Sequence, residues 1–204
     1  MQISAETASP TRSIPLVFED PTSHSVPTVR ASVPGDEPNG MHGQRAPHWS
    51  DELVEIAMAS AVSTIAVPPL EPLTPILVSI ATAGPILVVL PTAYRADMAR
   101  RALTKSGIAA ASFDSDWGAC RTMTSVGARS SVFAPLLGAS AIVVVDEHDE
   151  RLTEEGSPTW NARDIAIERA RRARIPCIFL TATPTVDAAA AGPVLRPARK
   201  VERL

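Results

Sequence analysis

The sequence has little of several residue types on which common folds and sites depend. Of its 204 residues, two are cysteines, Cys120 and Cys177, and 4% are aromatic. Two cysteines are too few for a disulfide framework or a four-cysteine zinc site, so we expect no structural metal and a fold that disulfide bonds do not stabilise. Prolines interrupt the longest apolar stretch, and residues 1–4 lack signal-peptide character. We therefore expect a cytoplasmic protein with no membrane contact.

The charge is close to balanced. The 19 Lys+Arg and 22 Asp+Glu give a net charge of −3, which excludes a strongly basic protein that coats nucleic acid by charge alone. The hydrophobic share of 45% is enough to build a buried core.

Proline divides the chain. Seven of the 19 prolines fall in the first 47 residues, among Ser, Thr, His and Asp and with few apolar side chains. Such a segment buries too little apolar surface to offset the entropy of ordering it, so residues 1–47 are predicted to be a disordered tail. We expect one domain over 48–192 and a basic C-terminal tail over 193–204.

Helical and strand patterns alternate through the predicted domain. Helices are predicted from residue 49 and over 74–84, 95–106 and 161–174, and strands over 85–91, 108–113, 122–126, 140–145 and 176–180. Strands that are apolar on both faces and separated by helices indicate a parallel sheet covered on both sides. The predicted fold class is therefore three-layer α/β, in which ligands bind beyond the C-terminal ends of the strands.

Two of the predicted strands end in residues that carry chemistry. The strand 140–145 runs into Asp146 and Glu147, a Walker B arrangement in which the aspartate holds Mg²⁺ through water and the glutamate polarises the attacking water. The strand 176–180 runs into Thr181, Ala182 and Thr183, which match the S/T-A-T motif of superfamily 2 helicases. Solvated loop acids and ordinary turn chemistry remain the alternative interpretations.

Four ordered blocks extend this match. They read V-G-A-R-S-S-V-F-A-P (126–135), I-V-V-V-D-E-H-D-E (142–150), E-G-S-P-T-W-N-A-R-D-I-A (155–166) and I-P-C-I-F-L-T-A-T-P-T (175–185). Together they resemble the PriA (primosomal protein N′) family of replication-restart helicases. The resemblance covers about 60 residues and implies a first RecA-like lobe of the P-loop NTPase type. The alanine and arginine content suits a high-GC genome such as an actinobacterial one, and actinobacterial members of the family lack intact helicase motifs.

The resemblance also implies DNA contacts. The block that holds Gly127 and Arg129 borders the DNA path in the family, and the loop after the Asp-Glu pair senses bound DNA. In this sequence that loop keeps Trp160, which Arg163 follows as the family pattern requires. A packing role at a helix entrance is the alternative for Trp160.

The sequence lacks a phosphate-binding loop. It has two lysines, Lys105 and Lys200, and no G-x-x-x-x-G-K-S/T motif. The segment 67–74 aligns with the position of this loop and carries prolines and an acid. Leu73 stands where the lysine of the loop is expected. Thr74 keeps the hydroxyl that would face Mg²⁺. The residues of this segment that bear on phosphate binding are Pro68, Pro69, Glu71, Pro72, Leu73 and Thr74. Because proline has no N–H to donate, we expect no ATP binding in the ordinary P-loop mode and no cofactor.

Three functions stay open. The first is a non-catalytic, DNA-associated lobe that binds fork or single-stranded DNA weakly and works with other replication-restart proteins. The second is an ATP-dependent helicase or ATPase subunit that uses Asp146 and Glu147, for which ATP and Mg²⁺ would be needed. The third is an inert protein-interaction scaffold. Residues 161–204 carry nine bases and four acids, which suits either a weak phosphate-contacting patch or a solvated helix face.

Overall fold

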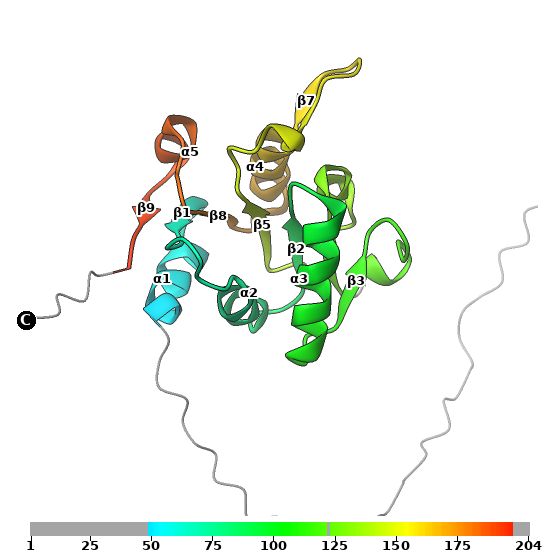
Figure 1. Cartoon of the computed structure of the whole chain (residues 1–204), viewed down its shortest axis with the longest axis horizontal. Coiled ribbons are helices and arrows are strands. Elements are labelled where there is room, and N and C mark those ends of the chain that lie inside the picture. The colour runs from blue at the N-terminus through cyan, green and yellow to red at the C-terminus, as the bar shows by residue number, and fades with distance from the viewer. Residues whose placement is uncertain (1–48, 122, 198–204) are drawn as a thin grey trace, which may run out of the picture. The chain divides into compact units, whose positions relative to one another are not determined.

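The computed structural model describes residues 49–121 and 123–197 (Figure 1). The predicted tail 1–47 and residues 198–204 of the predicted basic tail lie outside the described residues.

Seven strands form one sheet in the order β3-β4-β2-β5-β8-β1-β9, and every neighbouring pair is parallel. The strands are β1 (Val62–Ala66), β2 (Ile86–Val89), β3 (Ala110–Ser112), β4 (Thr124–Gly127), β5 (Ala141–Val145), β8 (Cys177–Thr181) and β9 (Val194–Leu195). The predicted α/β class is confirmed, and the arrangement is RecA-like.

Helices cover both faces of the sheet. They are α1 (Trp49–Met58), α2 (Thr74–Ala81), α3 (Ala93–Lys105), α4 (Ala162–Ala173) and α5 (Val186–Ala191). Alternate residues of β5 enter two separate cores. Val143 and Val145 pack with residues of α1, α2 and α3, and Ile142 and Val144 pack with residues of α4 and α5. The predicted three layers are therefore present.

Side-chain caps move two helix starts from their predicted positions. Thr92 accepts a hydrogen bond from the Arg95 backbone N–H, so α3 begins at Ala93 and not at residue 95. Asn161 caps α4 in the same way, which places its first helical residue at Ala162. The predicted helix 74–84 ends at Ala81, and Gly84 follows with a φ of 142°.

The sequence patterns did not predict some short elements. A two-stranded hairpin, β6 (Thr153–Glu154) and β7 (Trp160–Asn161), projects from the rest of the molecule beside α4 (Figure 1). Its strands have two residues each, which is below the length at which alternation can be recognised. Within the described ranges, no helix has the length and apolar character that a membrane span requires.

Candidate functional site

Three of the predicted segments meet at the C-terminal edge of the sheet. The segment 67–73 follows β1, Asp146 follows β5, and Thr181 ends β8, which lies between those two strands. All three contribute to the lining of one cavity of about 160 Å³. The structure therefore brings the predicted phosphate segment, the acid pair and the threonine motif together, as parallel strand ends require.

The segment 67–73 is shaped by its prolines. Pro68, Pro69 and Pro72 have no backbone N–H. The Val67 N–H donates to the Thr181 carbonyl at 2.9 Å, and the Glu71 N–H donates to the Pro68 carbonyl at 3.1 Å. These two donors are therefore already engaged within the protein.

Helix α2 starts directly after this segment. It begins at Thr74, and Leu73 at its N-cap position supplies no side-chain cap. Leu73 and Thr74 thus occupy the helix N-terminus, as the alignment predicts.

Asp146 forms an ion pair that the sequence patterns did not reveal. The Nη1 atom of Arg95 lies 2.5 Å from the Asp146 Oδ2 atom. Arg95 lies in the first turn of α3, and its side chain is 40% exposed against 24% for Asp146. Asp146 has a φ of 49°, in the left-handed region. The position of Arg95 just after β2 was the available signal, because the residues after each parallel strand gather at one edge.

Glu147 is buried beside Asp146. Its Oε1 atom accepts a hydrogen bond from the Thr185 N–H at 2.9 Å, and its Oε2 atom has no hydrogen-bond partner among the described residues. The His148 Nδ1 atom lies 3.8 Å from that Oε2 and 3.2 Å from the Thr181 hydroxyl. The Thr183 N–H donates to the same hydroxyl at 3.3 Å. Thr181 is buried, whereas Ala182 and Thr183 are exposed.

A second group of predicted residues gathers at the end of β4. Arg129 and Trp160 line a cavity of about 440 Å³ together with Glu154. The Arg129 guanidinium lies 2.5 Å from the Glu154 carboxylate. Trp160 packs edge-to-face on the exposed ring of Phe133, with ring centroids 5.1 Å apart. Trp160 therefore makes a packing contact, as the alternative of a packing role requires, and it also lines the same cavity as Arg129.

Arg163 does not line this cavity. Its guanidinium pairs with Asp164 at 3.0 Å and with Asp187 of α5 at 3.2 Å, and its side chain is 18% exposed. Burial acts to lower the pKa of Arg163, but the hydrogen bonds and charges of the two aspartates outweigh it and raise that pKa above its usual value. Arg163 links α4 to α5, so the structure does not place it with Arg129 and Trp160.

The other arginines of α4 also have protein partners. Arg171 and Arg172 both pair with Glu168, at 2.8 and 2.6 Å, and their hydrogen bonds lower the Glu168 pKa to about 2. Arg169 donates to the carbonyls of Val132 and Ala134. The basic helix is thus partly neutralised.

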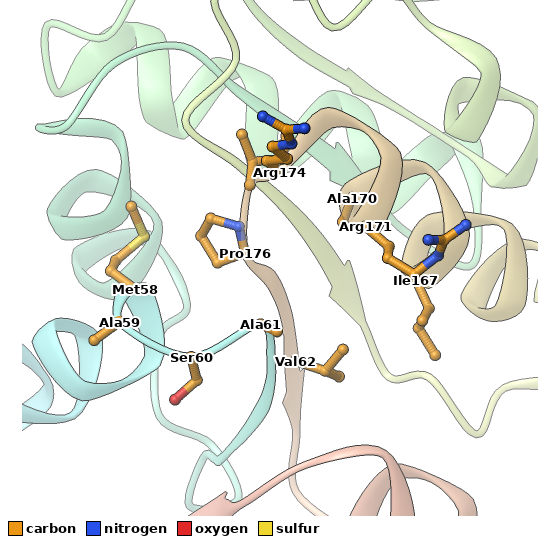
Figure 2. Close-up of a pocket in the computed structure, with 11 residues that line it drawn as sticks. Met58, Ala59, Ser60, Ala61, Val62, Ile167, Ala170, Arg171, Arg174 and Pro176 are labelled. Atoms are coloured by element: carbon orange, nitrogen blue, oxygen red, sulfur yellow. The ribbon is translucent and has the colours of Figure 1, made fainter.

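A further cavity of about 460 Å³ lies between the C-terminal ends of α1 and α4. Figure 2 shows its mostly apolar lining, with Met58 and Pro176 facing it and the guanidinium groups of Arg171 and Arg174 beside it. None of the predicted site residues lines it. Within 49–121 and 123–197, no cluster of three or more His, Cys, Asp or Glu side chains could hold a metal ion.

These features define an α/β lobe of the RecA-like type whose polar groups gather at the C-terminal edge of the sheet. No family model matches the chain. Curated relatives named replication restart protein PriA do match it. The Bacillus subtilis protein is 37% identical over 62 residues, which are 30% of this chain and 8% of the relative. The Treponema pallidum protein is 36% identical over 63 residues, 31% of this chain and 10% of the relative.

The Helicobacter pylori PriA gives a similar match, with 37% identity over 62 residues, 30% of this chain and 10% of the relative. The chain is therefore related to PriA over this segment. The matched segment spans about a tenth of the length of these relatives or less.

Proposed function

We propose that this chain is a PriA-related lobe that associates with DNA in replication restart and does not hydrolyse ATP. The observation that carries the proposal is the composition of the segment 67–73 at the C-terminal edge of the sheet. Its proline positions offer no N–H groups, and Glu71 adds a carboxylate to the lining of the cavity.

The dimensions and charges of this cavity support the proposal. Its volume of about 160 Å³ is smaller than the ~300–1,000 Å³ of ordinary small-molecule sites. A nucleoside triphosphate with Mg²⁺ needs backbone donors and a lysine near the phosphates, but Leu73 stands at the lysine position. These residues do not fit Mg²⁺-ATP.

The group around Arg129 supports the DNA part of the proposal. Proteins bind single-stranded nucleic acid by combining guanidinium groups, which contact phosphates, with aromatic rings, on which bases stack. Arg129 and Trp160 line one cavity, and Phe133, whose ring contacts Trp160, is 52% exposed as a residue. With few such contacts, we expect weak, salt-dependent binding, with a Kd of ~10⁻⁴–10⁻⁶ M.

Fluorescence anisotropy tests the proposal directly. Forked and single-stranded DNA are titrated with the full chain at low and physiological salt, with and without Mg²⁺-ATP. We expect binding that ATP leaves unchanged and that Arg129→Ala weakens. Arg101→Ala is the matched control, because Arg101 is also an ion-paired arginine but lies on α3. Binding that responds to ATP would overturn the proposal, and absence of DNA binding would leave the scaffold alternative.

One observation favours an ATPase as the second candidate. Glu147 is buried and its Oε2 atom has no hydrogen-bond partner among the described residues, as a carboxylate kept for a water molecule would be. An ATPase assay of the wild-type chain and of Glu147→Gln decides this point. Activity that is lost in Glu147→Gln would favour the second candidate over our proposal.

A further inference from the structure

We propose that Arg95 supplies, from within the chain, the positive charge that a metal ion would place beside Asp146, and that the acid pair now acts as an internal clamp. This inference rests on the proposed non-catalytic function and assigns a role to the residues of that same site.

The Arg95–Asp146 contact carries the first half of the inference. Both side chains line the cavity at the C-terminal edge of the sheet, and their charged atoms are 2.5 Å apart. At this distance the guanidinium fills space next to the carboxylate oxygen and cancels its charge. A divalent cation would have to displace an ion pair that is more than half buried, and like-charge repulsion from Arg95 would oppose it.

The position of Arg95 is set by helix α3, so the Arg95–Asp146 ion pair does not depend on the segment 67–73. Arg95 belongs to α3, whose start is fixed by the Thr92 cap at the end of β2. The cap places Arg95 in the first helical turn, 51 residues before its partner in the sequence. The ion pair therefore ties α3 to the end of β5.

Glu147 carries the second half. Its Oε1 atom accepts the Thr185 N–H at 2.9 Å. Thr185 is the N-cap of α5, and its own hydroxyl accepts from the Ala188 N–H at 3.1 Å. Glu147 thus fixes the turn between β8 and α5, while Asp146 fixes α3. Each acid holds a different neighbouring element, which explains why the pair coexists with a proline-filled phosphate segment.

Manganese titration of the ¹⁵N-labelled full chain tests the inference without nucleotide or DNA. Bound Mn²⁺ broadens the amide signals of nearby residues, so even weak binding is located. In the wild-type chain we expect no selective broadening at residues 145–148. In Arg95→Ala we expect that broadening to appear at a Mn²⁺ concentration about tenfold below the highest one used, at which the wild type still shows none. Arg95→Ala/Asp146→Asn should lose it again.

Two further variants keep the test decisive. Arg95→Gln removes the charge but keeps most of the side chain, and it replaces Arg95→Ala if the alanine variant does not give a folded spectrum. Arg101→Ala, which removes an exposed, ion-paired arginine from the same helix, should behave as the wild type does. Selective broadening at 145–148 in the wild type, or none in either Arg95 variant, would overturn the inference. Neither result would alter the DNA and ATP measurements that decide the proposed function.

Discussion

Arg129 and Glu154 form a 2.5 Å ion pair that joins the turn after β4 to the projecting hairpin. The hydrogen bond from the Gly156 N–H lowers the Glu154 pKa below its usual value, and the Arg129 charge lowers it further against the opposing effect of burial. Glu154 is therefore ionised at neutral pH and competes with any phosphate for the Arg129 guanidinium.

We predict that Glu154→Gln strengthens DNA binding by about two- to fivefold, because it frees Arg129 and removes a negative charge. Arg129→Ala should weaken binding and reduce the slope of log Kd against log salt by about 1. Anisotropy titrations over a series of salt concentrations measure both effects.

The control for this prediction is Glu168→Gln, which changes the net charge equally but frees arginines on α4. Its effect should be smaller. Equal strengthening by both variants would show that overall charge, and not the Arg129 site, controls affinity.

A second prediction concerns Arg169. Its guanidinium donates to the carbonyls of Val132 and Ala134 and so ties α4 to the turn after β4. Burial lowers the Arg169 pKa, but the side chain stays charged at neutral pH because arginine titrates far above it. Lysine cannot reproduce two bonds from one planar group. Arg169→Lys should therefore reduce the free energy of unfolding by about 1–3 kcal/mol.

Urea denaturation measures this change. Arg171→Lys is the control, because Arg171 lies on the same helix with its side chain 69% exposed, and it should stay within about 0.5 kcal/mol of the wild type. If Arg169→Lys also stayed within about 0.5 kcal/mol of the wild type, the two carbonyl contacts would contribute little to stability.

The sequence predicted most of the sheet, but β9 (Val194–Leu195) pairs with β1 inside the segment predicted as a C-terminal tail. It predicted the contacts at the edge of the sheet only partly. The apolar run 140–145 predicts a strand that is buried on both faces, and the acids that follow this run indicate where the strand ends. Residue pairs far apart in the sequence leave no local pattern. Arg95 pairs with Asp146 across 51 positions, and Arg129 with Glu154 across 25. Helix α5, with four consecutive alanines, has neither apolar periodicity nor length.

A third prediction concerns Cys177. Burial in β8 raises its pKa from the usual 9.0 to about 12, so its thiolate is scarce at ordinary pH. We expect Cys177 to resist alkylation by iodoacetamide at pH 8 and to react once urea unfolds the chain. Mass spectrometry of labelled peptides follows each cysteine separately. Rapid labelling of Cys177 in the folded protein would contradict its burial.

The same pKa has a consequence for stability. Below pH 9 the thiol is protonated in both the folded and the unfolded chain. Between pH 9 and about 12 only the unfolded chain ionises this group, so stability falls as the pH rises. Above pH 9, Cys177→Ala should therefore lose stability less steeply than the wild type does, which thermal denaturation over a pH series can measure.

The last prediction separates packing from DNA contact at Gly127. A Cβ at this position would lie 2.6 Å from the Ser131 Cβ and 3.2 Å from the Phe113 Cβ. Gly127→Ala should therefore lower the free energy of unfolding by about 1–3 kcal/mol through overpacking. Gly118→Ala, whose Cβ would meet no atom within 4 Å, should change it little.

Rescue by a second substitution completes this test. Ser131→Gly removes the nearest clashing atom, so Gly127→Ala/Ser131→Gly should recover part of the lost stability, while the Phe113 contact retains the rest. If Gly127 acts only by letting the turn that carries Arg129 pack closely, the rescued variant should also recover DNA affinity. The reference for affinity is Ser131→Gly alone, which also lacks the Ser131 side chain and its 2.6 Å hydrogen bond to the Ala128 carbonyl. A stable double variant that binds DNA more weakly than Ser131→Gly would instead mean that DNA approaches the Gly127 backbone itself, because these two variants differ only by the methyl group at residue 127.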